Sequence, residues 1–118
     1  MRLCVCAIAD AVAPDTESHV IEKSRHSAFF KIPLEELLSK MNRDHVVVCG
    51  VFAHHGVMVS TIGGYMRNFQ MTLVADALGD YSEDEHRFAL KYVAQMCGSV
   101  STVEAIERLL SKIGRAHV

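Results

Sequence analysis

The fold of this chain is decided by the stretch HVVVCGVFAHHGV, residues 45–57. Its three consecutive valines, 46–48, form an uninterrupted apolar run of the kind found in strands that are buried on both faces of a sheet. A helix is predicted next, over about 55–67, and an apolar strand over 70–75 follows it. Strand, helix and strand in this order predict a right-handed crossover and parallel pairing.

The same alternation continues toward the N-terminus. The pattern predicts a loop over 13–18, a short strand over 19–22 and a helix that opens with Pro33, because proline suits the first helical turn. A turn at 42–44 separates that helix from the valine strand. The apolar face of the helix comprises Leu34, Leu37, Leu38 and Met41.

Two further helices are predicted downstream. Ser82 and Glu85 form a capping box that opens the first, and Ser101 and Glu104 form one that opens the second. A short strand over 99–101 lies between the two helices. The buried stripe expected on the first of them consists of Phe88, Tyr92, Val93 and Met96.

These elements predict a single α/β domain over residues 1–118, in which helices on both faces of a mostly parallel, Rossmann-like sheet of three to five strands make three layers. The pair Gly63 and Gly64 lies inside the helix after the valine strand, where each glycine costs about 1 kcal/mol relative to alanine. We expect close packing at this point against a neighbouring strand or subunit.

Composition limits the classes of function. The chain has 118 residues, of which 50% are apolar, and a formal net charge of -2 from mixed acidic and basic residues. Such a length and apolar content are typical of one globular domain. The mixture of acidic and basic residues shows no basic stretch of the kind that binds nucleic acid. No apolar run approaches the ~20 residues of a membrane span.

The N-terminal stretch allows two interpretations. Arg2, the apolar run 3–9 and the small residues 11–13 follow the order of a short signal peptide. Asp10 interrupts this order, and the stretch is shorter than the usual ~15–30 residues. A buried strand over 3–9 is therefore the favoured interpretation.

The cysteines are Cys4, Cys6, Cys49 and Cys97. Cys4 and Cys6 have no second pair at metal-ligand spacing, so the sequence predicts no zinc site. Small buried thiols in a reducing cytosol are the favoured interpretation, and a cytoplasmic protein is expected.

Five motifs follow one another along the chain. They read KSRHSAF (23–29), GVFAHHGVM (50–58), YMRN (65–68), VADALGDYS (74–82) and KYVA (91–94). In order and spacing they resemble the C-terminal half of the isochorismatases, the hydrolases of siderophore and phenazine pathways. The resemblance covers residues 13–110 and leaves 1–12 unmatched, so it implies an isochorismatase-like fold, truncated by the family's N-terminal part.

The resemblance implies four site residues. Lys23 matches the active-site lysine, whose cation could hold the carboxylates of the substrate or stabilise developing charge. His26 and Phe52 stand where the family usually has tyrosines at the substrate, and Gly56 lets a ligand approach the backbone. A cis peptide bond between Val51 and Phe52 is also implied. A solvated surface lysine is the alternative interpretation of Lys23.

The implied reaction is hydrolysis of the vinyl ether of isochorismate to pyruvate and a dihydroxy-cyclohexadiene carboxylate. Val57 occupies the place of the cysteine nucleophile of related enzymes, so amidase chemistry is not expected. The family's proton donor is an aspartate on an N-terminal strand with which no segment here aligns. Asp10 is the one candidate general acid, although it lies too close to Lys23 in the sequence for an ordinary parallel crossover.

Two functions remain open from the sequence. The first is an isochorismatase-like hydrolase that needs no cofactor, acts on a small isochorismate-like molecule and is impaired in this short chain. The second is a non-catalytic remnant that serves as an oligomerisation or partner module. A homo-oligomer is expected in both cases, with neither nucleic acid nor membrane as a partner. His54 and His55 are not expected to bind a metal, because adjacent side chains rarely chelate one ion.

Overall fold

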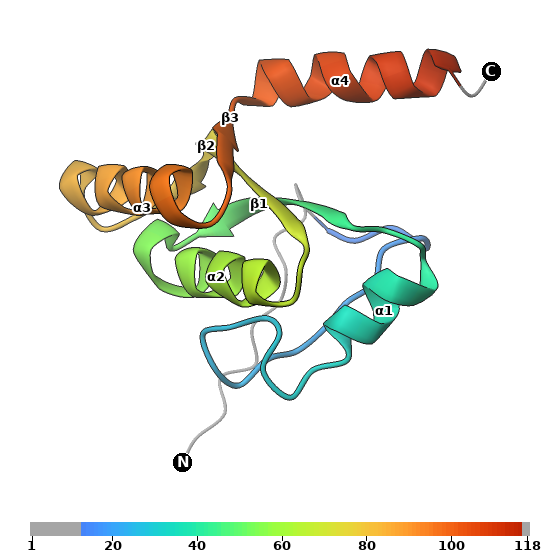
Figure 1. Ribbon diagram of the computed structural model, residues 1–118, viewed down its shortest axis with the longest axis horizontal. Coiled ribbons are helices and arrows are strands. Elements are labelled where there is room, and N and C mark those ends of the chain that lie inside the picture. Colours follow the sequence, from blue (N-terminus) through green and yellow to red (C-terminus); the bar gives the residue numbers. More distant parts are fainter. Residues whose placement is uncertain (1–12, 117–118) are drawn as a thin grey trace.

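Among residues 13–116, which the computed structural model describes, three parallel strands form the centre of the fold (Figure 1). They are β1 (His45–Val51), β2 (Gln70–Gly79) and β3 (Ser99–Ser101). The strands lie in the order β1-β2-β3, and both pairs run parallel. The predicted parallel α/β sheet is therefore confirmed, at the lower end of the expected number of strands. Side chains are described up to residue 112.

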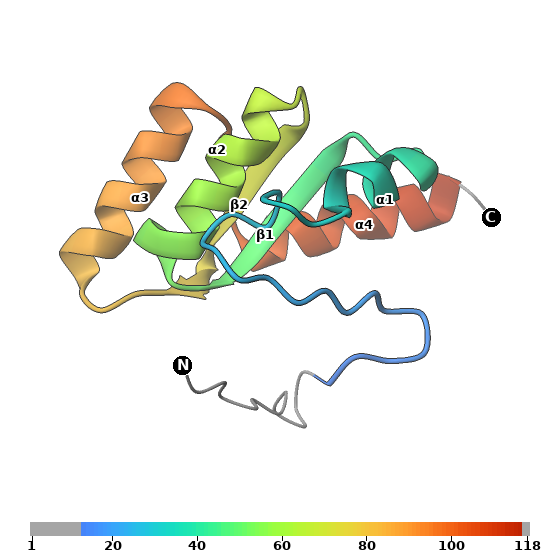
Figure 2. The ribbon, with the colours of Figure 1, turned by 90° about the horizontal axis from the view of Figure 1, so that it is seen from below.

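Helices lie on both sides of this sheet. α2 (Met58–Met66) and α3 (Glu83–Met96) lie on one side, and α4 (Val103–Ala116) extends from the end of β3 on the other (Figure 1, Figure 2). A π-helical turn, η2 (Ala53–Val57), joins β1 to α2, and the short α1 (Leu34–Lys40) precedes β1. None of the described helices is long and apolar enough to cross a membrane.

The core lies between the sheet and the pair α2 and α3. Leu73 of β2 and Val93 of α3 are fully buried and pack in one cluster with Val57 and Cys97. Val57 is the last residue of η2, so its burial fixes the end of η2 in the core. Since side chains two residues apart on a strand share a face, Met71 points to the same side as Leu73. A neighbouring cluster comprises Phe29, Phe69 and Met71.

The glycines of α2 allow a close approach to β2. A Cβ atom on Gly64 would collide with the thioether of Met71, and it would lie 3.1 Å from the ring of Phe29. A Cβ atom on Gly63 would lie 3.0 Å from Ser27 Oγ. The expected close packing against a neighbouring strand is confirmed, and it accounts for two glycines inside a helix.

One face of β1 is open. Val47 is 43% exposed and Val51 is 66% exposed, and Cys49 between them is exposed as well. The prediction that this strand is buried on both faces is wrong, and so is the prediction of a buried thiol at Cys49. β1 is an edge strand among the described residues, and α4 contacts β2, the central strand.

Segment 19–22 is not a strand. It pairs with no neighbour in the described structure, and Val20 is 63% exposed. Its apolar residues favour a strand locally, but a strand needs a neighbour to receive its backbone hydrogen bonds. The predicted loop over 13–18 is confirmed. The strand predicted over 3–9 lies outside the described residues, as do Cys4 and Cys6.

The stripe predicted on α3 is half wrong. Val93 is fully buried as expected, but Phe88 and Met96 are 56% and 59% exposed, and Ala89 is buried instead. Ala89 and Val93 face the core, Leu90 and Tyr92 pack at its margin, and Phe88 and Met96 lie on the outer side of the helix.

The helix starts agree with one of the two predicted caps. Ser82 Oγ accepts a hydrogen bond from the backbone N–H of Glu85 at 3.3 Å, as predicted for α3. At α4 the cap is Thr102, whose Oγ1 accepts from the N–H of Ala105 at 3.2 Å. Ser101 is the last residue of β3 and does not fill this role.

Candidate active site

The carboxyl ends of β1 and β2 meet beside a pocket of about 290 Å³. Ligands of parallel sheets bind at this edge, where the segments after the strands converge. The lining residues come from three segments far apart in the sequence. They are Lys23, His26, Val51, Phe52, His55, Gly56 and Tyr81. The structure thus brings the predicted residues Lys23, His26, Phe52 and Gly56 to one place, while Asp10 lies outside the described residues.

Lys23 reaches the pocket from the loop before α1. Its Nζ donates a hydrogen bond to the carbonyl oxygen of Arg25 at 3.1 Å and remains exposed. A Cβ atom on Gly56 would lie 3.5 Å from this Nζ and 3.3 Å from the carbonyl oxygen of His26. The missing side chain of Gly56 is therefore what leaves space beside the ammonium group.

Aromatic and imidazole rings form the walls. Phe52 stacks on Tyr81 with ring centres 4.4 Å apart and an angle of 21° between the planes. His26 stacks on His55 at 5.5 Å. The pocket therefore joins one cation to flat rings, an arrangement that suits a small anion with a ring of its own.

His55 and Tyr81 were not predicted as site residues. In the sequence, His55 stands out only as one of two adjacent histidines, and Tyr81 only as part of the motif over 74–82. A usable signal was present, because Tyr81 follows β2 just as Phe52 follows β1. In parallel strands such positions meet at the same sheet edge.

A single carboxylate connects the two segments that carry the rings. Asp80 Oδ2 accepts from the backbone N–H of His54 at 2.8 Å, and Oδ1 accepts from the N–H of Tyr81 at 2.8 Å. The ring Nδ1 of His54 lies 2.6 Å from Oδ1. Burial by itself would raise the pKa of Asp80, but the hydrogen bonds from Tyr81 and His54 outweigh it and hold this pKa below its ordinary value.

Glu85 lies near the same pair, with ligand atoms of His54, Asp80 and Glu85 within 4.8 Å of one another. The carboxylate of Asp80 already accepts hydrogen bonds on both oxygens. Its side chain is fully buried, so these bonds have no replacement from solvent. His54 and Asp80 are therefore accounted for as a hydrogen-bonded junction between η2 and the segment after β2, whereas Glu85 Oε2 is buried without a hydrogen-bond partner among the described residues.

Two implied features of the β1 end are present. The peptide bond between Val51 and Phe52 is cis. Val57 is 5% exposed, packs in the core and lines an apolar groove beside the pocket. Neither Cys49 nor Cys97 lines the pocket itself, although Cys49 lines the adjoining groove.

The pocket continues into an apolar groove of about 360 Å³ along β1. Lys23, Val51 and Gly56 line both spaces. The rest of the groove is formed mainly by β1 and the residues facing it, which include Ala28, Phe29, Leu34, Val46 and Val48. The pocket is thus open toward the unpaired edge of the sheet.

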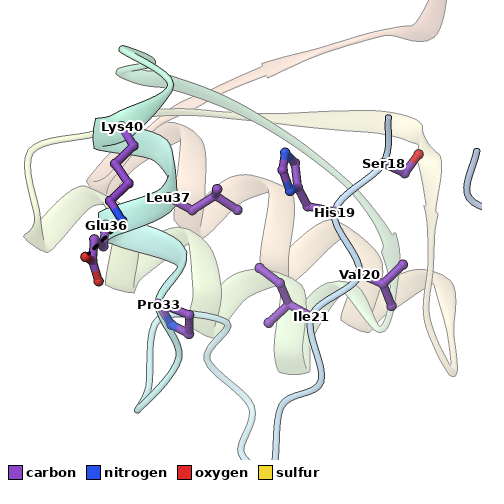
Figure 3. A pocket seen from close by; sticks show the side chains of 8 residues that line it. All are labelled: Ser18, His19, Val20, Ile21, Pro33, Glu36, Leu37 and Lys40. Carbon is purple, nitrogen blue, oxygen red and sulfur yellow. Dashed lines mark ion pairs between the residues drawn. The ribbon is translucent and has the colours of Figure 1, made fainter. Parts of the chain in front are cut away.

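A separate pocket, of about 360 Å³, lies between loop residues 18–21 and α1 (Figure 3). Glu36 and Lys40 on its rim pair with each other at 3.4 Å, and both side chains are exposed. None of the predicted site residues lines this space. It is the gap between a loop and a short helix.

Comparison with known proteins identifies the family. The isochorismatase domain matches residues 4–105, so the chain belongs to the isochorismatase family. It is similar to the phenazine biosynthesis protein PhzD1 of Pseudomonas aeruginosa, with 40% identity over 99 residues, covering 84% of this chain and 48% of that protein. Enterobactin synthase component B of Escherichia coli K12 is also 40% identical over 99 residues, covering 84% of this chain and 35% of that protein.

Solved structures share the fold. An isochorismatase-like hydrolase from Alkaliphilus metalliredigens superimposes with a TM-score of 0.81 at 18% identity, covering 87% of this chain and 57% of that one. A cysteine hydrolase from Pseudomonas syringae gives 0.83 at 23% identity, covering 89% and 55%. The chain therefore spans about half the length, or less, of the relatives that it matches.

Proposed function

We propose that this chain provides the substrate-holding half of an isochorismatase-type hydrolase, which cleaves the vinyl ether of isochorismate to pyruvate and a dihydroxy-cyclohexadiene carboxylate. The observation that carries this proposal is the single pocket in which Lys23, His26, Phe52 and Gly56 meet. The 40% identity to a phenazine biosynthesis protein and to an enterobactin synthase component supports the same substrate class.

The pocket suits an anionic ring. Lys23 holds a carboxylate, Gly56 leaves room beside the ammonium group, and Phe52 covers one side of the ring. In the reaction, a proton adds to the methylene carbon of the vinyl ether, and water attacks the cation at the ether carbon. The resulting hemiketal collapses to pyruvate and the diol. Lys23 stabilises the carboxylate beside the reacting carbon through these steps.

The described residues supply no carboxyl group to the pocket as proton donor. We therefore infer that the isolated chain is impaired, since loss of a general acid removes ~10²–10⁴-fold in rate. Asp10 remains the candidate donor within this sequence. Alternatively the donor comes from another chain at the open edge of β1.

The alternative function is non-catalytic. The unpaired edge of β1 and its apolar groove favour a module that binds another chain or a second copy of itself. In this case the pocket retains the family's shape without turnover. A homo-oligomer in the cytoplasm fits both functions, and the thiols of Cys49 and Cys97 are free, as in a reducing compartment.

The test measures binding and turnover separately. Isochorismate binding is followed by tyrosine fluorescence, since the chain has no tryptophan and Tyr81 lines the pocket. Pyruvate release is followed with lactate dehydrogenase. We expect binding by the wild type, loss of binding in Lys23→Ala, and little turnover in either. Asp10→Asn is the matched variant for the candidate donor.

The outcomes separate the two functions. Robust pyruvate release that Lys23→Ala abolishes would establish the hydrolase and refute the impairment, and loss of that release in Asp10→Asn would assign the donor. Failure of the wild type to bind isochorismate at millimolar concentration would reject the substrate-holding role and favour the non-catalytic module.

A further inference from the structure

The pocket walls belong to two segments that no strand hydrogen bond joins directly. Phe52 and His55 follow β1, whereas Tyr81 follows β2. The register of the two strands ends with Val51 opposite Gly79, so the chain beyond these residues lies outside the ladder. Something other than the sheet must hold the two walls in place against each other.

Asp80 supplies that connection. It accepts from the backbone N–H of His54 in one wall and from its own neighbour Tyr81 in the other, both at 2.8 Å. The third contact, with Nδ1 of His54 at 2.6 Å, requires the proton on that nitrogen, because an ionised carboxylate only accepts. The Asp80 side chain is fully buried and does not line the pocket.

The ring of His54, which Asp80 holds, in turn contacts the rings of the pocket. Its centre lies 4.1 Å from that of His55, which in turn stacks on His26 at 5.5 Å. Tyr81 contacts Phe52 at 4.4 Å and His55 at 5.8 Å. Phe52 therefore touches Tyr81 and His55 touches His54, the two residues that Asp80 holds, whereas His26 is reached only through His55.

We propose that Asp80 is the positioning residue of the pocket and that the Phe52–Tyr81 wall it fixes selects a ring-bearing carboxylate over an open-chain one. The inference deepens the proposed function and rests on the pocket's role as the ligand site. Asp80 acts through His54 and Tyr81, while Tyr81 contacts the ligand ring. Lys23 holds the carboxylate in either case and gives no preference for a ring.

Asp80→Asn is the central variant. Asparagine has the same shape, but one acceptor oxygen is replaced by an NH₂ group that faces N–H donors. At least one of the three contacts is then lost. The matched control is Asp76→Asn, in which a carboxylate of β2 accepts from the N–H of Val103 at 2.8 Å, away from the pocket. An asparagine oxygen can keep that single bond.

Two measurements follow the effect in the whole chain. Nuclear magnetic resonance reports the protonated Nδ1 of His54 and the proximity of the Phe52 and Tyr81 rings. Titration with benzoate and acetate measures the preference for a ring. We expect Asp80→Asn to lose the signal of the protonated His54 Nδ1 and the proximity of the Phe52 and Tyr81 rings. It should bind benzoate roughly tenfold more weakly, as for loss of one charge-assisted hydrogen bond. Acetate binding should change little, and Asp76→Asn should match the wild type.

Tyr81→Leu keeps the Asp80 side chain and removes only the ring of the wall. It should retain the His54 signature and lose the preference for benzoate over acetate, and it decides the ligand preference if Asp80→Asn does not fold. Equal binding of benzoate and acetate by the wild type would overturn that preference. An Asp80→Asn protein with intact ring contacts and wild-type benzoate affinity would overturn the positioning role.

These outcomes are distinguishable from failure of the proposed function. Benzoate results as expected, with no isochorismate binding, would reject the hydrolase proposal alone. Isochorismate binding that is lost in Lys23→Ala, combined with wild-type ring contacts and benzoate affinity in Asp80→Asn, would reject the positioning role alone.

Discussion

The pocket has room for a ligand beside Lys23 because residue 56 has no side chain. The space that a Cβ atom would fill is bounded by Lys23 Nζ at 3.5 Å and the carbonyl oxygen of His26 at 3.3 Å. Gly56 also lies one residue before Val57, which is buried in the core. The backbone at this point therefore has little freedom to move away from an added group.

Gly56→Ala should weaken ligand binding more than it affects folding. The methyl group occupies space next to the ammonium group, while its contacts of 3.3–3.5 Å need only small adjustments. We expect benzoate or isochorismate affinity to fall by roughly tenfold, with an unfolding midpoint in urea near that of the wild type. Unchanged affinity would show that the ligand does not approach this backbone.

Gly98→Ala should be costly for stability. A Cβ atom there would lie 2.5 Å from the carbonyl oxygen of Met71 and 3.2 Å from Val93, so backbone must shift. A loss of about 1–3 kcal/mol in the free energy of unfolding is expected, as for other overpacked sites. Gly64→Ala is the comparison. There the colliding group is the flexible thioether of Met71, and alanine regains about 1 kcal/mol of helix propensity. Urea unfolding that ranks Gly64→Ala as the worse variant would contradict this account.

The helix start at α4 depends on a residue that the capping-box pattern does not select. Thr102 accepts from the N–H of Ala105, and Asp76 of β2 accepts from the N–H of Val103. These contacts satisfy backbone donors that the first helical turn leaves free. β3 has the predicted bounds and includes Ser101, so the cap falls on the next residue, Thr102.

Thr102→Ala should destabilise α4 by about 0.5–2 kcal/mol, which is typical of a lost N-cap. Ser101→Ala is the matched control and should have a smaller effect, because Ser101 does not cap the helix. Hydrogen exchange of the amide of Ala105 reports the change locally. Faster exchange in the Ser101 variant than in the Thr102 variant would restore the cap predicted from the sequence.

The strands were predictable because both contain apolar residues in short runs. The valines of β1 are uninterrupted, whereas Thr72 divides the run over 70–75; both strands begin where they were predicted, and β2 continues to Gly79. Burial was not predictable in the same way, because it depends on neighbours. Val47 and Val51 are apolar and exposed, since no described element covers that face. The strand predicted over 19–22 failed for the related reason that it has no partner.

The site residues also differ in whether the sequence alone could predict them. Lys23, His26, Phe52 and Gly56 follow from motif positions, and the structure gathers them in one pocket, while their roles remain predictions. Tyr81 could be predicted as a site residue only from the pairing of β1 with β2, which no single motif reveals. Hydrogen bonds such as those of Asp80 depend on side-chain positions that a sequence pattern does not fix.

Acid should destabilise the whole molecule in a way that Asp80 controls. Its pKa is lowered from 3.8 in the folded protein, because the hydrogen bonds from Tyr81 and His54 outweigh the effect of burial. The carboxylate therefore contributes stability that is fully present above pH 3.8 and is lost as the pH falls through the folded pKa. The free energy of unfolding of the wild type, measured with urea, should fall more steeply with pH below pH 3.8. That of Asp80→Asn should fall less steeply there. Identical slopes for the two proteins would contradict this assignment.

Self-association should occur through β1 rather than through the glycines of α2. Gly63 and Gly64 face Ser27, Phe29 and Met71 within the chain, so they are not free to contact a second copy. The open face of β1 instead exposes Val47 and Val51 beside an unpaired strand edge. Exposed apolar surface costs ~25 cal/mol per Å², and unpaired edges recruit other chains.

Sedimentation at micromolar concentration tests this surface directly. The wild type should sediment as a dimer or larger, and Val51→Lys should shift it toward the monomer, because a charge on this face resists burial and blunts an edge strand. Tyr65→Ala on α2 is the matched control, since Tyr65 is 50% exposed and belongs to the helix that packs with Val48 on the other face of β1. A protein that Tyr65→Ala dissociates and Val51→Lys does not would place the interface on α2. A wild type that stays monomeric and does not aggregate would show that the chain covers β1 by itself.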